Sequence, residues 1–173
     1  MSDPVLLTDQ EMETWLAFIG SSRALQAELD RQLQRDAGIP ESWFGVLALL
    51  ADQPGRSARQ SDLAVIADFS LSRLSHALDR MEERGWVSRE PDPVDRRASH
   101  ATLTDAGLSA LAEAAPGHAA ALRRLFLGRI TDEQAAALRA AGRSILQGLG
   151  AFPPGLVAPS GFEDCGENSA ATR

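Results

Sequence analysis

Residues 63–107 read LAVIADFSLSRLSHALDRMEERGWVSREPDPVDRRASHATLTDAG and predict two short helices joined by a tight turn. A capping box at Ser57 and Gln60 is expected to start the first helix, and Ser70 is expected to cap the second. The second helix ends before Gly85 and has one apolar stripe. The stripe consists of Leu71, Leu74, Leu78 and Met81. These are the elements of a helix-turn-helix, whose second helix fits the major groove of DNA, although other helix pairs share the pattern.

A β-hairpin with a long tip is expected directly after the second helix. Residues 86–88 and 99–103 have extended patterns, and the loop between them is rich in Pro, Asp and Arg. Arg96 and Arg97 lie at its tip. Because a thin loop that bears arginine can enter a narrow minor groove, the hairpin predicts the wing of a winged helix-turn-helix.

Amphipathic helices are expected on the N-terminal side of this region. Thr8 and Glu11 form a capping box that starts a helix of about 27 residues, roughly 40 Å long, which ends at Gly38. This length exceeds what the core of a small domain requires, so part of its apolar face is expected to meet a second chain. A mostly apolar helix then starts at residues 40–42 and is predicted to be fully buried.

Two further helices are expected after the hairpin. Thr104 caps the first of them, which Pro116 and Gly117 should kink or divide into two half-helices. A capping box at Thr131 and Gln134 starts the last helix. Its narrow Leu/Ala stripe suits close packing against another helix.

The composition is that of an ordinary globular domain. The chain has 173 residues, of which 44% are hydrophobic and 24% charged, and its net charge is −7. The charge is unevenly distributed, because residues 1–53 contain three arginines and nine acidic residues, whereas residues 54–100 contain eight of each. Any DNA binding would therefore depend on a few well-placed arginines rather than on a broad basic surface.

Several other classes of function lack support in the sequence. Catalytic triads, paired carboxylates and phosphate-binding loops are not recognisable at usable spacing, so we expect neither enzymatic activity nor a cofactor. The three histidines are not paired at ligand spacing, and the single cysteine, Cys165, lies near the C-terminus, so no metal site or disulfide is expected. The N-terminus lacks signal-peptide features and no apolar run is long enough to span a membrane, which predicts a cytoplasmic protein.

Residues 63–107 resemble the winged helix-turn-helix of MarR-type regulators. The most specific motifs are L-x-R-M-E-E-R-G-W-V-x-R at 78–89 and D-R-R-A-x-x-x-x-L-T-x-A-G at 95–107, and a looser similarity extends over residues 8–148. The resemblance implies an obligate homodimer, built from the first and the last two helices of each protomer. It also implies a pseudo-palindromic DNA operator and, in most members, release by a small ligand.

The expected fold is mainly α with a small β-hairpin wing, as a winged helix-turn-helix plus a helical dimerisation region. On this interpretation residues 1–38 hold an N-terminal dimerisation helix and residues 39–103 the DNA-binding region. Residues 104–150 hold the C-terminal dimerisation helices, and residues 151–173, rich in Pro, Gly, Ser and acids, form a flexible tail.

The resemblance assigns DNA-binding roles to individual positions. Arg97 is expected to reach the minor groove, and Asp95 to hold the loop or the Arg97 guanidinium by a charge-assisted bond. Arg73 is expected to read a guanine through two hydrogen bonds, and the other residues to contact phosphate or water. The full set is Arg56, Arg59, Ser70, Ser72, Arg73, Ser75, His76, Asp95, Arg96 and Arg97.

Ordinary surface chemistry is the alternative for several of these charges. Arg80 and Arg84 lie near Asp79, Glu82 and Glu83, so local pairs along a solvated helix face would explain them, and we favour that interpretation for Arg84.

The resemblance also implies an effector site in the crevice between the dimerisation helices and the DNA-binding lobe, suited to a small aromatic or phenolic compound. Its expected lining is Trp15, Phe18, Ile19, Trp43, Leu47 and His118. Aromatic residues at helical spacing also fit an ordinary core. Redox sensing is not expected because the first helix contains no cysteine.

These observations predict a sequence-specific, DNA-binding transcriptional regulator, specifically a ligand-responsive repressor that acts as a homodimer. The alternative is a dimeric small-molecule-binding or protein-interaction module of the same fold without an operator, which the neutral charge of residues 54–100 favours.

Overall fold

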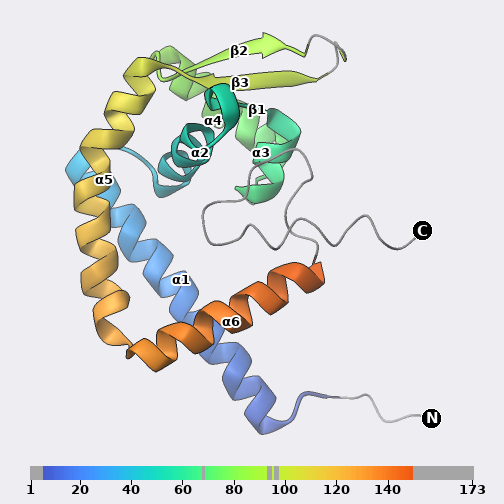
Figure 1. Ribbon diagram of the computed structural model, residues 1–173, viewed down its shortest axis with the longest axis vertical. Helices are drawn as coiled ribbons and strands as arrows, with labels where there is room; N and C mark the ends of the chain where they lie inside the picture. The colour runs from blue at the N-terminus through green and yellow to red at the C-terminus, as the bar shows by residue number, and fades with distance from the viewer. Residues whose placement is uncertain (1–5, 68, 93–94, 96–97, 150–173) are drawn as a thin grey trace.

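The computed structural model describes residues 6–67, 69–92, 95 and 98–149 of the chain (Figure 1). The α-helices in these residues are α1 (Asp9–Ala37), α2 (Glu41–Ala51), α3 (Gln60–Ile66), α4 (Leu71–Glu83), α5 (Asp105–Leu125) and α6 (Asp132–Leu149). The strands are β1 (Ser57–Arg59), β2 (Val87–Pro91) and β3 (Ser99–Leu103), and short 3-10 turns lie at Pro54–Arg56 and Leu127–Arg129.

The structure has two parts: a winged lobe, formed by α2, α3, α4 and the sheet, and a helical part, formed by α1, α5 and α6. The two parts meet at one end of α1 and α5. The antiparallel sheet has the order β1-β3-β2, and α2, α3 and α4 lie beneath it, as Figure 1 shows. The long helices α1 and α5 lie side by side and extend away from this winged lobe, and α6 follows the turn at the far end of α5. The core of the winged lobe is closed by fully buried residues from several elements, among them Val46, Leu47, Leu63, Leu74, Leu78 and Met81.

The capping signals in the sequence are confirmed at four helix starts, of which Thr104 at α5 is described below. Thr8 and Glu11 form a reciprocal capping box at α1, and Thr131 and Gln134 do the same at α6. Ser70 caps α4, and Gly85 follows this helix with φ of 71°, a backbone conformation that favours glycine.

The L-T-x-A-G motif at 103–107 fastens the start of α5 to Trp86, the residue directly before β2. Thr104 donates its backbone N–H to the carbonyl of Trp86 at 3.0 Å, and its hydroxyl accepts the N–H of Gly107 at 3.1 Å. The Trp86 carbonyl lies so close to Gly107 that a Cβ at this position would overlap it. Glycine is therefore required at this contact, where α5 begins against the start of the wing.

The expected helix start at Ser57 is wrong. Ser57–Arg59 form the strand β1, which pairs with β3, and α3 begins only at Gln60 with no side-chain cap. The Ser57 hydroxyl instead accepts a hydrogen bond from Thr102 across the strands at 2.9 Å. The hairpin is thus part of a three-stranded sheet, because the pairing partner of β3 lies more than 40 residues earlier in the chain and local spacing does not reveal it.

Pro116 does not divide its helix. The helix α5 runs unbroken from Asp105 to Leu125, and Figure 1 shows it as one bowed helix. A proline removes one backbone donor, and the packing of α5 along α1 and α2 compensates for this loss.

The helix α2 is less buried than the predicted full burial. Val46, Leu47 and Leu50 are buried, but the other positions of this helix are only half-buried.

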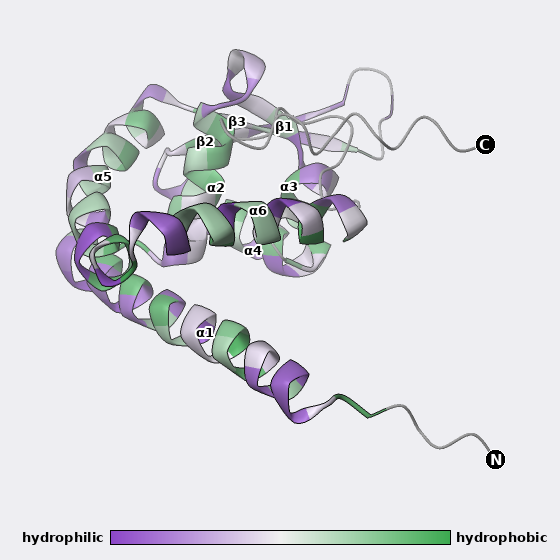
Figure 2. Cartoon of the chain, turned by 60° about the horizontal axis from the view of Figure 1, so that its bottom comes forward, coloured by the Kyte–Doolittle hydropathy of each residue, from purple (hydrophilic) through white to green (hydrophobic). Residues whose placement is uncertain are grey.

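Apolar side chains remain exposed along the helices outside the winged lobe, as the hydropathy colouring of α1 and α6 in Figure 2 illustrates. On α1 they are Met12, Trp15, Leu16 and Phe18, and on α6 they are Leu138, Ile145 and Leu149. No residue of α6 is buried. None of the helices formed by the described residues is long and apolar enough to cross a membrane.

Candidate nucleic-acid interface

The first turns of α4 present polar side chains to solvent. Ser72, Arg73 and His76 are exposed, and Ser75 is half-buried. The Ser70 hydroxyl accepts the N–H of Arg73 at 3.2 Å, which leaves the other free N–H groups of the first turn directed outward. A helix N-terminus with free N–H groups and hydroxyls suits the phosphates of a nucleic acid backbone.

The opposite side of α4 is fixed in the core. Its buried residues are Leu74, Ala77, Leu78 and Met81. Leu71, which we expected in this apolar stripe, is instead 61% exposed because it is the first residue of the helix and lies beyond the edge of the core. The outward face of α4 is therefore held rigidly while its polar side chains remain accessible.

Arg73 is the most prominent cation on this face. Its guanidinium lies 4.5 Å from the centre of the Phe69 ring, in a cation–π contact. Such a contact is worth about 0.5–1 kcal/mol at an exposed site, so a stronger bidentate partner such as a guanine edge would displace it. Phe69 thus restrains Arg73 in the unbound protein without blocking its use.

His76 extends freely from the same face. Its side chain is 85% exposed, and Nδ1 lies 3.7 Å from an Asp79 oxygen, too far for a hydrogen bond. The imidazole is therefore available to an external partner.

Asp92, a residue that sequence analysis missed, organises the base of the wing. Its side chain is only 4% exposed, and Oδ2 accepts hydrogen bonds from Arg59 and from His100 Nε2, each at 2.9 Å. Its other oxygen accepts the backbone N–H of Asp95 at 2.9 Å. Arg59 and His100 are opposite each other in the β1–β3 register, so Asp92 joins both strands to the start of the tip.

This arrangement changes the picture of Arg59 and Asp95. Arg59, expected at a phosphate, is held by Asp92 with 43% of its side chain exposed, so it can face a phosphate only from the wing base. Asp95 was expected to hold the loop through its side chain. In the described part of the wing, the backbone N–H of Asp95 donates a hydrogen bond to the side chain of Asp92. The signal for Asp92 was the Asp-Pro-Val-Asp spacing, because an Asp side chain commonly accepts a backbone N–H a few residues later in a turn.

Arg96 and Arg97, the predicted tip of the wing, lie outside the described residues, and so does Cys165. The described strands nevertheless carry the hairpin beside α4. Asp92 N–H donates to the Ala98 carbonyl at 3.0 Å, which continues the pairing of the two strands toward the tip.

Arg89 ties the wing to α4, the second helix of the helix-turn-helix and its expected recognition helix. It extends from β2 and binds two acids of α4, Asp79 at 2.7 Å and Glu82 at 2.6 Å. The hydrogen bond that Arg89 donates to Glu82, with a further contribution from Asp79, raises the pKa of the Arg89 guanidinium. These bonds fix the distance between β2 and α4, which are the two elements expected to enter adjacent grooves.

Two further arginines lie at the borders of this region. Arg56, another expected phosphate contact, has φ of 55° and forms a 2.9 Å ion pair with Asp105 at the start of α5. The Asp105 side chain is almost fully exposed, so this pair is weak and can exchange its partner.

The favoured interpretation of Arg84 is wrong, whereas a local pair does form at Arg80. Arg80 binds Glu83 at 3.0 Å, three residues along α4. Arg84 instead stacks against Trp43 and Trp86, with its guanidinium 5.2 and 4.7 Å from the ring centres. Trp86 follows Arg84 by two residues, whereas Trp43 belongs to α2, so Arg84 packs against a different helix, which local spacing along α4 does not indicate.

The expected effector residues are not brought into one cavity. Trp15 and Phe18 are about half exposed on α1 and contact each other, whereas Leu47 is fully buried in the core of the winged lobe. Phe18 lines a groove between α1 and α6, and Trp43 lines a different hollow beside α4. Ile19 is half-buried, on the same helix as Phe18.

His118 occupies a distinct environment. Its ring packs on Phe44 with a centroid distance of 4.5 Å, and its buried Nδ1 has no hydrogen-bond partner among the described residues. Burial lowers the pKa of the His118 imidazole, because it disfavours the charged form. His118 is therefore a neutral group at the junction of α2 and α5.

Comparison with known proteins identifies this arrangement. A model of the MarR family matches residues 37–98. The crystal structure of Sco3205, a MarR family transcriptional regulator from Streptomyces coelicolor in complex with DNA, has a TM-score of 0.78 and 43% identity to this chain. That match covers 86% of this chain and 93% of Sco3205. The chain belongs to the MarR family.

Other members of the MarR family are also similar to this chain. The crystal structure of AbsC from Streptomyces coelicolor has a TM-score of 0.75 and 35% identity, over 83% of this chain and 97% of AbsC. The transcriptional repressor MprA of Escherichia coli K12 is 32% identical over 97 residues, which are 56% of this chain and 55% of MprA. The chain thus matches about half of the length of this curated relative. The predicted family and fold class are confirmed, and members of this family are transcription regulators rather than enzymes.

Proposed function

We propose that this chain is a sequence-specific DNA-binding transcriptional regulator that acts as a homodimer on a pseudo-palindromic operator. The exposed N-terminal face of α4, braced against β2 by Arg89, is the observation that carries the proposal. Sco3205, whose structure contains DNA, has the same fold over most of both chains.

The two elements expected to read DNA have different tasks. The α4 face, with Arg73 at its centre, enters the major groove, while the wing approaches the neighbouring minor groove. The Asp92 cluster holds the base of the wing and the Arg89 bridge holds its distance from α4. A preset distance between two readers favours binding because less freedom is lost when the complex forms.

The homodimer and the response to a ligand belong to the same proposal. Apolar side chains exposed on α1 and α6 support a second copy as their partner, since such surfaces mark interaction sites. Dimerisation would place two α4 helices about one turn of duplex apart, roughly 34 Å. We propose that the chain represses transcription in the cytoplasm and that a small aromatic or phenolic effector releases it.

A DNA-binding titration tests the proposal. Duplexes that the purified protein enriches from genomic DNA are labelled and titrated by fluorescence anisotropy at several salt concentrations. We expect affinity to fall steeply with salt, because phosphate contacts release counterions. Arg73→Ala should weaken binding by about 1–3 kcal/mol, the usual worth of a base-reading arginine.

The matched control is Arg31→Ala, which removes an arginine from α1 that pairs with Glu28 at 2.8 Å. This variant should bind like the wild type. Arg97→Ala is titrated in the same series and should also weaken binding. If the wild type binds no duplex at low salt, the proposal is refuted and the interaction module without an operator is favoured instead.

A further inference from the structure

A leucine lies at the start of α4, where the other exposed side chains are polar. Leu71 is the first residue of this helix and is 61% exposed, whereas the buried residues of α4 begin only at Leu74. Single exposed leucines are common on protein surfaces and need no function by themselves. The place of Leu71 is special, because it belongs to the first turn of the helix that is proposed to enter the major groove.

Leu71 lies on the side of α4 that is next to the wing. Residues 71, 75, 79 and 82 follow one another at steps of three and four, so their side chains share one side of the helix. Two of them, Asp79 and Glu82, bind Arg89 of β2 at 2.7 and 2.6 Å. The side of the helix that includes Leu71 is therefore the side that approaches β2.

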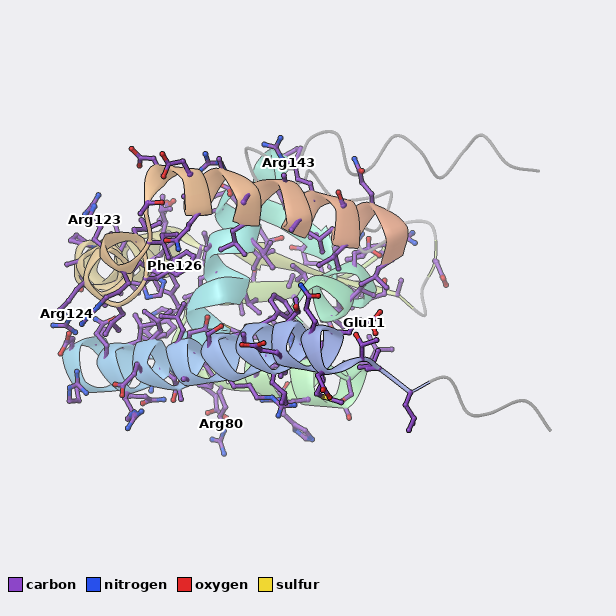
Figure 3. All side chains as sticks on the ribbon, turned by 90° about the horizontal axis from the view of Figure 1, so that it is seen from below. Glu11, Arg80, Arg123, Arg124, Phe126 and Arg143 are labelled. Carbon is purple, nitrogen blue, oxygen red and sulfur yellow. The ribbon has the colours of Figure 1, made fainter. Side chains whose placement is uncertain are left out.

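Arginines lie on the other side of α4. Arg73 contacts the Phe69 ring, and Arg80 follows Arg73 two turns later. Both arginines line the hollow between α4 and the start of α2, and Figure 3 shows Arg80 extending away from the ribbon. Leu71 and Arg73 thus project to opposite sides of Ser72, one of them apolar and the other charged.

The charge on the wing side of α4 does not suit a DNA phosphate. Asp79 and Glu82 carry two negative charges and share one guanidinium, that of Arg89, so one negative charge is left over. Because a phosphate is itself an anion and binds to cationic groups, this side is expected to meet DNA at the uncharged edge of a base.

The major groove offers one apolar group to such a side chain. Of the groups that base edges present there, the 5-methyl group of thymine is apolar, whereas the others are hydrogen-bond donors and acceptors. The N-terminal residues of a recognition helix are the ones that contact base edges. Leu71 is the first of these residues, and contact with a methyl group would remove apolar surface of both partners from water.

We propose that Leu71 is a specificity-determining residue, which contacts the 5-methyl group of a thymine in each operator half-site while Arg73 reads a guanine in the same half-site. The inference rests on the proposed function and adds one base to what the operator must contain. It gives the two sides of α4 different tasks, since Arg73 reads by hydrogen bonds and Leu71 by apolar contact.

Removal of single methyl groups from the DNA tests this contact. In a duplex that the purified protein enriches from genomic DNA, each thymine of one half-site is replaced in turn by deoxyuridine, which lacks only the 5-methyl group. Binding of the full chain is titrated by fluorescence anisotropy. At one thymine position or more, we expect the wild type to bind about fourfold more weakly, the effect of losing one buried methyl group.

The variant Leu71→Ala assigns the effect to this side chain. It should bind the thymine duplex more weakly than the wild type and lose no further affinity with deoxyuridine at the sensitive position, because its side chain no longer reaches the methyl group. The matched control is Val65→Ala, which shortens a 60% exposed apolar residue of α3 in the same lobe and should keep the fourfold loss. Comparing two duplexes within one variant cancels any effect of the substitution on folding.

Two results overturn this inference and leave the proposed function intact. One is duplex binding by the wild type that no deoxyuridine substitution weakens. The other is that every deoxyuridine effect persists at full size in Leu71→Ala. If the wild type binds no duplex at low salt, the proposed function is refuted and this inference with it.

Discussion

Removal of the Asp92 carboxylate should loosen the whole base of the wing. In Asp92→Ala, Arg59 and His100 lose the oxygen that both contact at 2.9 Å, and the N–H of Asp95 loses its acceptor. The substitution affects β1, β3 and the tip together, because Asp92 is the residue where these three segments meet.

The size of the effect follows from burial. A hydrogen bond to a charged group contributes about 1.5–3 kcal/mol, and Asp92 accepts three bonds while only 4% exposed. Arg59 and His100 are 43% and 32% exposed, so water replaces part of what they lose. We therefore expect a loss of about 2–4 kcal/mol from a total stability of about 5–15 kcal/mol.

Thermal unfolding and hydrogen exchange measure this loss. The Tm of Asp92→Ala should fall, and the amides of β1 and β3 should exchange faster than those of α5. Glu90→Ala is the matched control, because Glu90 is an exposed acid of β2, two residues before Asp92. An unchanged Tm together with unchanged exchange in β1 and β3 would refute the role assigned to Asp92.

Three further outcomes are expected. Ile145→Asp introduces a charge on the exposed apolar face of α6 and should yield monomers in sedimentation, whereas Gln147→Asp, on the opposite side of that helix, should leave dimers. The lowered pKa of His118 means that the folded protein binds fewer protons than the unfolded one, so stability is retained above a pH of about 6.5 and lost as the pH falls below it. His118→Gln should flatten this loss in a series of Tm measurements from pH 7 to 5, and an unchanged slope would contradict the burial argument. Arg84→Ala removes two cation–π contacts and should cost about 1 kcal/mol in urea unfolding, whereas Arg80→Ala should cost less than about 0.5 kcal/mol.

The sequence predicted much of the recognition helix but little of how its neighbours hold it. Ser70, Arg73 and His76 lie on the exposed start of α4, where a cap and an apolar stripe indicated them. Asp92, His100 and Arg89 were not found, because each acts on a residue of another strand or helix. Their side chains are ordinary surface types in the sequence, and only the folded chain makes Asp92 a buried acceptor.

By itself, the sequence determined the local structure of this protein. The boxes at Thr8 and Thr131, the Ser70 cap and the left-handed Gly85 involve bonds over a few residues, so their spacing is sufficient to predict them. Tertiary structure alone decided that Ser57 begins a strand and that α5 continues through Pro116. In both cases contacts with distant segments outweighed the local preference, since pairing with β3 and packing along α1 and α2 contribute more than one cap or one backbone hydrogen bond.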